Sequence, residues 1–153
     1  MKRSYLIYAP LALSVFICGI FIAGGKLAIF WDPPSVMIVF LPSLFLLLGV
    51  FGPRGIVDAF KFAFEGTAAV RVDIEKGIAF FAMAGRIFLL SGIMGTLMGI
   101  LMTLFGFSQV QTIPVALYIV VAFNTMCYSV LMLLIVIVPF KTALEKRLAE
   151  MSA

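Results

Sequence analysis

Charged residues divide the chain into three long apolar runs, and these runs predict membrane-spanning helices. Residues 4–25, 33–53 and 87–140 contain no Asp, Glu, Lys or Arg. The third run is long enough for two spans of about 20 residues each. The stretch GFSQVQTIP at 106–114 is the expected turn between those two spans. The pattern therefore predicts an all-α membrane protein with four transmembrane helices.

The expected helices lie near 4–24, 34–52, 73–106 and 113–150, in a single membrane domain that covers residues 1–153. The second and third spans are joined by a short loop region, 53–83, in which the third helix already begins. A helix from 73 to 106 is about 51 Å long at 1.5 Å per residue. The hydrocarbon core of a bilayer is only about 30 Å thick. We therefore expect the third and fourth helices to extend beyond the membrane on one side.

Lys and Arg residues set the orientation of these helices. Two of them precede the first span, five lie between 54 and 86, and three follow residue 140, whereas Lys26 is alone on the other side. Because basic residues favour the cytoplasmic side of a membrane, both termini and the central region are predicted to be cytoplasmic. The long helices would then project into the cytoplasm.

The region after the second span contains the segment IVDAFKFAFEG at 56–66. Ile56, Phe60 and Phe64 recur every four residues, with charged residues elsewhere on the helical wheel. This spacing is typical of a short amphipathic helix on the inner membrane face. The same apolar side could instead cap the helix bundle as a simple connector, and both interpretations stay open.

Composition excludes several classes of function. The chain is 64% hydrophobic and 12% charged, with no His, and Cys18 and Cys127 both lie in apolar runs. A disulfide scaffold or a Cys/His metal site is therefore not expected. The predicted spans contain no carboxylate, and Arg86 lies at a cytoplasmic edge, so the chain lacks its own intramembrane proton carrier. We expect neither an enzyme nor a nucleic-acid-binding protein, and the expected surroundings are the lipid bilayer.

Small residues form a stripe along the third helix. Ser91, Gly95, Gly99 and Thr103 recur every four residues within SGIMGTLMGILMT. Such stripes let membrane helices approach closely, either within one subunit or between subunits. Proline adds bends, because Pro42 and Pro139 each remove one helical hydrogen bond.

The predicted third and fourth helices also carry polar side chains. A Thr or Ser can bond its own helix, whereas an Asn amide needs further partners. These groups form hydrogen bonds between helices, or they line a polar pathway for ions. The candidates are Thr96, Thr103, Asn124, Thr125 and Ser129.

Three motifs in order resemble the MotA/TolQ/ExbB proton-channel family, and most closely the A subunits of flagellar stators. GGKLAIFWDPPSVMIVF at 24–40 resembles the signature that follows the first helix of stator A subunits. SGIMGTLMGIL at 91–101 resembles the third-helix motif of the family. NTMCYSVLMLLIVIVPFKTALEKRL at 124–148 resembles its fourth helix, with Tyr128 and Pro139 at matching positions.

The resemblance implies a homopentamer around a dimer of single-helix partners of the MotB/TolR/ExbD kind, in the bacterial cytoplasmic (inner) membrane. The third and fourth helices would line the channel, and a partner Asp would carry H⁺ or Na⁺; no other cofactor is implied. Thr96 matches the third-helix threonine of the family, whereas its fourth-helix pore threonine falls on Met126, so that Asn124 or Thr125 is the candidate substitute.

Two functions are consistent with the sequence. The first is a subunit of an ion-driven rotary motor, which would power a flagellum or another process of the cell envelope. Flagellar stators carry a large charged region between helices two and three, and this chain has only about 30 residues there. The second is a four-helix membrane scaffold or assembly factor that transports nothing.

Overall fold

The computed structural model describes residues 3–64, 70–108 and 115–152, and helices make up nearly all of them. No strand occurs in these ranges, which confirms the all-α class. The expected 106–114 turn and the start of the fourth helix near 113 fall largely on residues outside the description. The elements are α1 (Arg3–Ile22), η1 (Leu27–Phe30), α2 (Pro33–Phe64), α3 (Arg71–Ser108), α4 (Val115–Met132), η2 (Leu133–Ile137) and α5 (Val138–Ser152).

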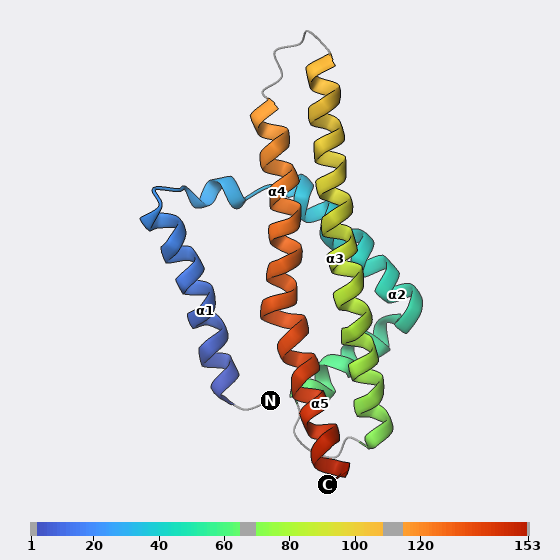
Figure 1. The fold of residues 1–153 in the computed structure, drawn as a ribbon. Helices are drawn as coiled ribbons and strands as arrows, with labels where there is room; N and C mark the ends of the chain where they lie inside the picture. Colours follow the sequence, from blue (N-terminus) through green and yellow to red (C-terminus); the bar gives the residue numbers. More distant parts are fainter. Residues whose placement is uncertain (1–2, 65–69, 109–114, 153) are drawn as a thin grey trace.

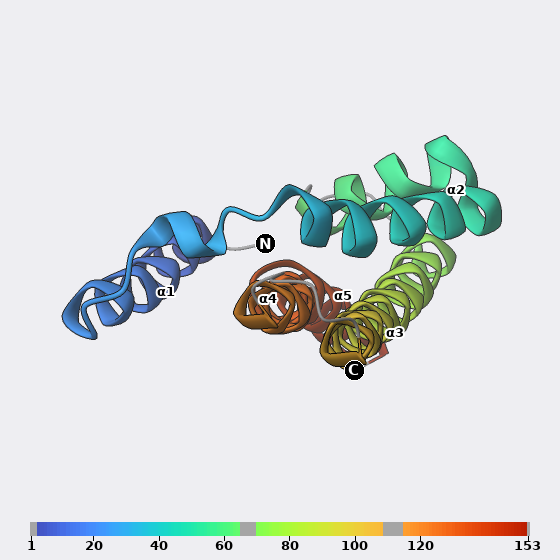
Figure 2. The ribbon, with the colours of Figure 1, turned by 90° about the horizontal axis from the view of Figure 1, so that it is seen from above.

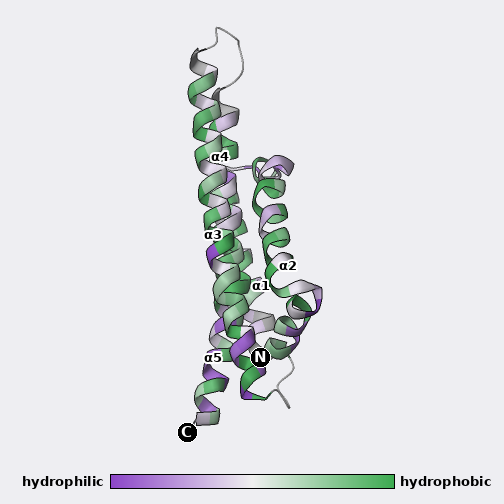
Figure 3. Cartoon of the chain, turned by 90° about the vertical axis from the view of Figure 1, so that its right-hand side faces the viewer, coloured by the Kyte–Doolittle hydropathy of each residue, from purple (hydrophilic) through white to green (hydrophobic). Residues whose placement is uncertain are grey.

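Three helical stretches are long and apolar enough to cross a bilayer, namely Leu27–Phe64, Arg71–Gly106 and Tyr118–Ser152. Tyr8–Ile22 is a further apolar helix, but it is shorter. The chain is thus a multi-pass membrane protein. Hydrophilic residues gather at the end of the bundle that holds the C terminus (Figure 3), where the sequence predicts the cytoplasm. A fourth crossing by α1, with both termini in the cytoplasm, remains a prediction.

α2 turns sharply at Gly52, the residue at which the sequence analysis ended the second helix. Gly52 has φ +68° and ψ 169° inside an otherwise helical stretch. A positive φ is accessible to glycine because it has no Cβ, and Pro53 then begins a new helical segment. That segment, residues 53–64, overlaps the predicted amphipathic helix, and its Ala59 and Ala63 are buried. α2 stays helical through Pro42, where the sequence predicts a bend.

The region between the second and third spans is mostly helical rather than a loop. α2 runs to Phe64, and α3 already begins at Arg71, two residues before the predicted start at Asp73. The Asp73 N–H donates to the Val70 carbonyl over 2.8 Å, so Asp73 belongs to the first turn of α3. Its carboxylate lies 3.8 Å from the Lys76 ammonium, on the same turn.

The fourth helix continues past Pro139 as α4, η2 and α5. A π-helical turn, Leu133–Ile137, lies just before Pro139, where the sequence predicts a bend. Pro139 has no N–H to donate to the carbonyl of Ile135, four residues earlier. The Tyr5 hydroxyl of α1 donates to that carbonyl. The N-terminal end of α1 is therefore joined to the π turn.

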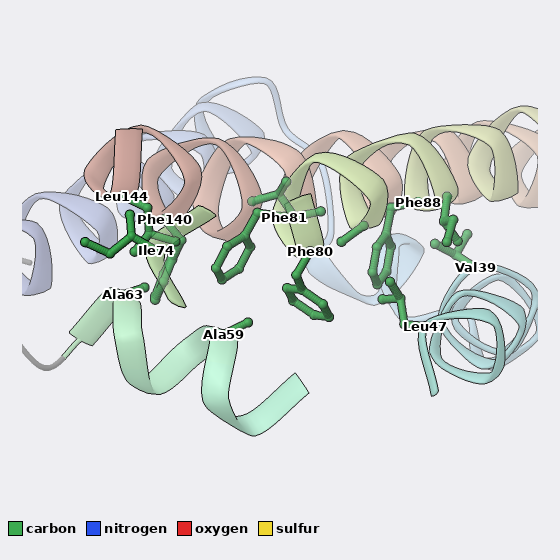
Figure 4. Close-up of a cluster of buried hydrophobic side chains, with 13 residues drawn as sticks. Val39, Leu47, Ala59, Ala63, Ile74, Phe80, Phe81, Phe88, Phe140 and Leu144 are labelled. Atoms are coloured by element: carbon green, nitrogen blue, oxygen red, sulfur yellow. The ribbon is translucent and has the colours of Figure 1, made fainter. Parts of the chain in front are cut away.

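Aromatic rings pack against one another at the end of the bundle that holds the C terminus, among them Phe80, Phe81 and Phe140 (Figure 4). Phe60 of α2 lies 5.2 Å from Phe81 of α3 and 5.6 Å from Phe140 of α5, between ring centroids. Such pairs stabilise beyond the burial of their surface. Arg147 of α5 also donates to the Phe62 carbonyl near the end of α2, over 2.7 Å. These contacts hold the turned segment of α2 against α3 and α5.

Candidate ion-pathway residues on α3 and α4

α3 and α4 lie side by side along most of their length (Figures 1 and 2). We define the seam as their contact at Gly92, Gly95 and Gly99 of α3 and Ala122, Thr125 and Ser129 of α4. A Cβ added at Gly92 would lie 2.5 Å from the Ser129 Cβ, and one added at Gly99 would lie 2.6 Å from the Ala122 Cβ. At Gly95 the added atom would lie 2.7 Å from the Thr125 Cγ2. Only glycine permits so close an approach here.

The predicted small-residue stripe is split between two contacts. Gly95 and Gly99 lie at the seam, together with Gly92, which the every-fourth-residue spacing missed. Ser91 instead faces α2, where its hydroxyl oxygen lies 3.0 Å from that of the buried Ser43. Helices that cross at a small angle meet through residues spaced three and four apart. Gly92, Gly95 and Gly99 follow this spacing, since they are three and four residues apart.

Two of the predicted pore residues meet at the seam. The Thr96 hydroxyl oxygen lies 3.0 Å from the Gly92 carbonyl, 3.0 Å from the Ala122 carbonyl and 3.3 Å from the Thr125 hydroxyl. Thr125 is fully buried and donates to the Ala122 carbonyl over 2.8 Å. Thr96 is only half-buried. The pair therefore places two hydroxyls together, one on a fully buried residue and one on a partly exposed residue.

The remaining three candidates are buried and bonded within the subunit. Ser129 donates to the Phe88 carbonyl across the seam, over 2.8 Å. Thr103 donates to the Gly99 carbonyl of its own helix, also over 2.8 Å. Asn124 points toward the segment between α1 and α2, and its amide donates to the Ile29 carbonyl over 2.9 Å. The structure thus brings Asn124 to a different contact from the other four candidates.

Tyr128 lies one turn after Asn124 and meets the same segment. Its hydroxyl donates to the Phe30 carbonyl and accepts the Asp32 N–H over 3.3 Å. Asp32 in turn accepts from the backbone and the hydroxyl of Ser35 at the start of α2, as an N-capping residue does. The family resemblance drew attention to Tyr128 by position, but its partner on η1 could not be inferred from that match.

The described residues contain no group of three or more His, Cys, Asp or Glu that could hold a metal ion. The seam itself is made of glycine, alanine, serine and threonine. An ionised group is absent from it, so the seam offers hydroxyl and carbonyl oxygens and no proton-binding carboxylate of its own.

A sequence model of the MotA/TolQ/ExbB proton channel family matches residues 57–153 of the chain. This range is more than half of the chain and contains α3, α4, η2 and α5. The chain belongs to the MotA/TolQ/ExbB proton channel family. The resemblance in the third-helix and fourth-helix motifs is thereby confirmed at the level of the family. No protein with a curated description matches the chain.

Membership has direct consequences for this MotA/TolQ/ExbB family protein. Members of the family are channel or scaffold proteins rather than enzymes, and they work with single-helix partner proteins in complexes. The matched range includes Thr96, Thr125 and the whole seam. The family match therefore covers both α3 and α4, the two helices that meet at the seam glycines.

Proposed function

We propose that this chain is the channel subunit of a motor complex driven by the H⁺ or Na⁺ motive force in the bacterial cytoplasmic membrane. Five copies would surround a dimer of a single-helix partner, and the partner would supply the Asp that carries the ion. Thr96 carries this proposal, because this half-buried residue lies on the family-matched helices and its hydroxyl lies beside that of Thr125. The load would be a flagellum or another envelope process.

The absence of carboxylates from the seam supports a shared site. A charge inside a membrane needs polar partners, and intramembrane ionisable groups commonly mark ion pathways. The seam supplies hydroxyl and carbonyl oxygens, and a partner Asp would supply the titrating group. A membrane potential provides about 2.3 kcal/mol per charge per 100 mV, which would drive each step of ion transfer.

A non-transporting scaffold is the second candidate, and one observation favours it. Each of the five predicted pore side chains already has a hydrogen-bond partner within the subunit. A protein that used these groups only to hold its helices together would have the same contacts. The two functions differ in whether removing the Thr96 hydroxyl changes ion flux.

The test compares Thr96→Val with Thr96→Ser in the complex formed by co-expression with a single-helix membrane partner. We expect an intact mass in detergent of five copies with two partners for the wild type and both variants. In vesicles, a pH-sensitive or Na⁺-sensitive dye should report flux that is lost in Thr96→Val and retained in Thr96→Ser. A mass that corresponds to a lone subunit would contradict the motor complex. Unchanged ion flux in Thr96→Val would show that the Thr96 side chain serves only helix packing.

A further inference from the structure

Arg86 is a charged residue on the apolar stretch of α3. Two contacts between α2 and α3, which run antiparallel, set the levels of their residues. Phe51 of α2 lies 5.2 Å from Phe80 of α3 between ring centroids, and Ser43 lies 3.0 Å from Ser91 between hydroxyl oxygens. Arg86 falls between these two contacts, so it is level with the apolar first part of α2.

The depth of Arg86 follows from the same contacts. The uncharged run of α2 ends at Arg54, so the contact between Phe51 and Phe80 lies near the membrane boundary. Arg86 is six residues further along α3, which is about 9 Å at 1.5 Å per residue. A charge at such a depth is costly, and a long arginine side chain lowers the cost by extending to polar groups at the boundary.

The described part of the subunit supplies no such polar partner. Arg86 is exposed, and no hydrogen bond or ion pair joins it to another described residue. The acids of α3 are already paired, Asp73 with Lys76 and Glu75 with Arg71. They also lie at least about 16 Å from Arg86 along the helix. The Arg86 guanidinium is therefore open to a group from outside the subunit.

The face of α3 that carries Arg86 changes character along the helix. Residues on this face are spaced by three or four; they are Ala79, Ala82, Arg86, Leu90 and Ile93. On the side of Arg86 toward the C-terminal end of the bundle, Ala79 is exposed and Ala82 is partly exposed. On the other side, Leu90 is 60% exposed and Ile93 37%. The alanines leave space beside the helix near the boundary, and the larger side chains present an apolar surface deeper in the membrane.

We propose that Arg86 binds the phosphate of an anionic phospholipid, whose acyl chains lie along Leu90 and Ile93. A guanidinium can donate two parallel hydrogen bonds to one phosphate. A phospholipid supplies a phosphate at the membrane boundary and hydrocarbon below it, in the same order as this face of α3, whereas a free anion or a lone carboxylate matches the arginine only. The predicted orientation places this end in the cytoplasm, where anionic lipids attract basic residues.

The test measures which lipid stays bound to the full chain in native mass spectrometry. The protein is held in detergent micelles that contain equal amounts of phosphatidylglycerol, which is anionic, and phosphatidylcholine, which has no net charge. We expect the wild type to retain phosphatidylglycerol in preference. Arg86→Gln should lower this preference about five-fold, the loss expected for one basic residue at an anionic surface. Arg86→Lys should keep part of it, because lysine keeps the charge without the paired donors.

Lys26→Gln is the matched control, because it removes one positive charge from an exposed residue at the opposite end of the spans. It should leave the lipid preference unchanged. Arg86→Gln should unfold like the wild type when followed by circular dichroism, since no hydrogen bond or ion pair to a described residue is lost. Excess inorganic phosphate should not displace the lipid, because it has no acyl chains to lie along Leu90 and Ile93.

Several results would overturn the proposal. An equal lipid preference in the wild type and Arg86→Gln would mean that Arg86 does not hold the lipid, and an equal loss in Lys26→Gln would show a general effect of net charge. Displacement by inorganic phosphate would indicate a site for a free anion. Release of a protein subunit by Arg86→Gln, with the lipid preference intact, would show that Arg86 pairs with a protein carboxylate such as Asp58 of another copy. Because the lipid is counted per chain, the result does not depend on whether the proposed ring forms.

Discussion

α1 and α2 are both outer helices beside the α3–α4 pair, and they are attached in different ways. α2 buries Ser35, Val39, Ser43 and Leu47, one residue per turn. α1 buries no described side chain and depends on hydrogen bonds at its two ends. In lipid an exposed apolar side chain costs little, because the solvent is as apolar as the side chain. A membrane helix can therefore remain attached without being packed.

The largest expected effect is the loss of stability when a glycine of the seam, rather than a glycine of α1, is replaced by valine. Gly99→Val should destabilise the subunit by about 1–3 kcal/mol, as overpacking does, or prevent its folding. An added Cβ at Gly99 would lie 2.6 Å from the Ala122 Cβ and 2.8 Å from its Cα. Denaturation of the subunit in detergent, followed by circular dichroism, measures this change.

Gly19→Val is the matched control on α1, where nothing lies within 4 Å of the added atom. Gly19→Val should leave the free energy of unfolding unchanged in the same denaturation experiment. Equal losses for the two variants would mean that valine acts through helix propensity and not through the seam.

A smaller effect is expected when a valine on each outer helix is shortened to alanine. Val39→Ala on α2 should lower the free energy of unfolding by about 1–2 kcal/mol, because it leaves a cavity in packed surroundings. Val39 is fully buried, whereas Val15 on α1 is 66% exposed and does not line the apolar groove between α1 and α4. Val15→Ala should therefore be close to silent in the same denaturation experiment. A Val15→Ala loss as large as that of Val39→Ala would show that α1 is packed in the subunit.

The smallest effect concerns the hydrogen bond between Tyr5 and Ile135. Tyr5→Phe should cost about 1 kcal/mol or less, the usual value for a hydrogen bond between membrane helices. In a Pro139→Ala background, the restored N–H of residue 139 can serve the Ile135 carbonyl. Tyr5→Phe should then cost less than in the wild type, and a double-mutant cycle measures the difference. Strictly additive losses would contradict a link between Tyr5 and the proline.

Sequence patterns predicted the parts of this structure that depend on neighbouring residues. The uncharged runs predicted the apolar helices, and Gly95 and Gly99 were identified as packing residues from their spacing. Gly92 was missed, since a strict interval of four drifts around a helix with 3.6 residues per turn. The end of the second helix was predicted at residue 52, where Gly52 has its positive φ, but the helical segment that begins directly at Pro53 was predicted only from Ile56 onward.

Contacts between distant residues were beyond the sequence patterns. Asn124 was singled out because its amide needs partners, but the carbonyl that it meets belongs to Ile29, 95 residues away. Such a pairing depends on how α4 lies against η1. Thr96 and Thr125 could each be identified as polar residues in a span, whereas their 3.3 Å approach follows from the seam.

The bond between Tyr5 and Ile135 joins residues 130 positions apart, and it has a consequence for biosynthesis. α1 leaves the ribosome first, yet its acceptor carbonyl exists only after the last apolar helix has been made. During translation α1 must wait in the bilayer, which its apolar surface permits. Because contacts between distant residues form late, attachment of α1 marks the completion of the subunit. A chain interrupted before η2 would lack Ile135 and would leave α1 without this hydrogen bond.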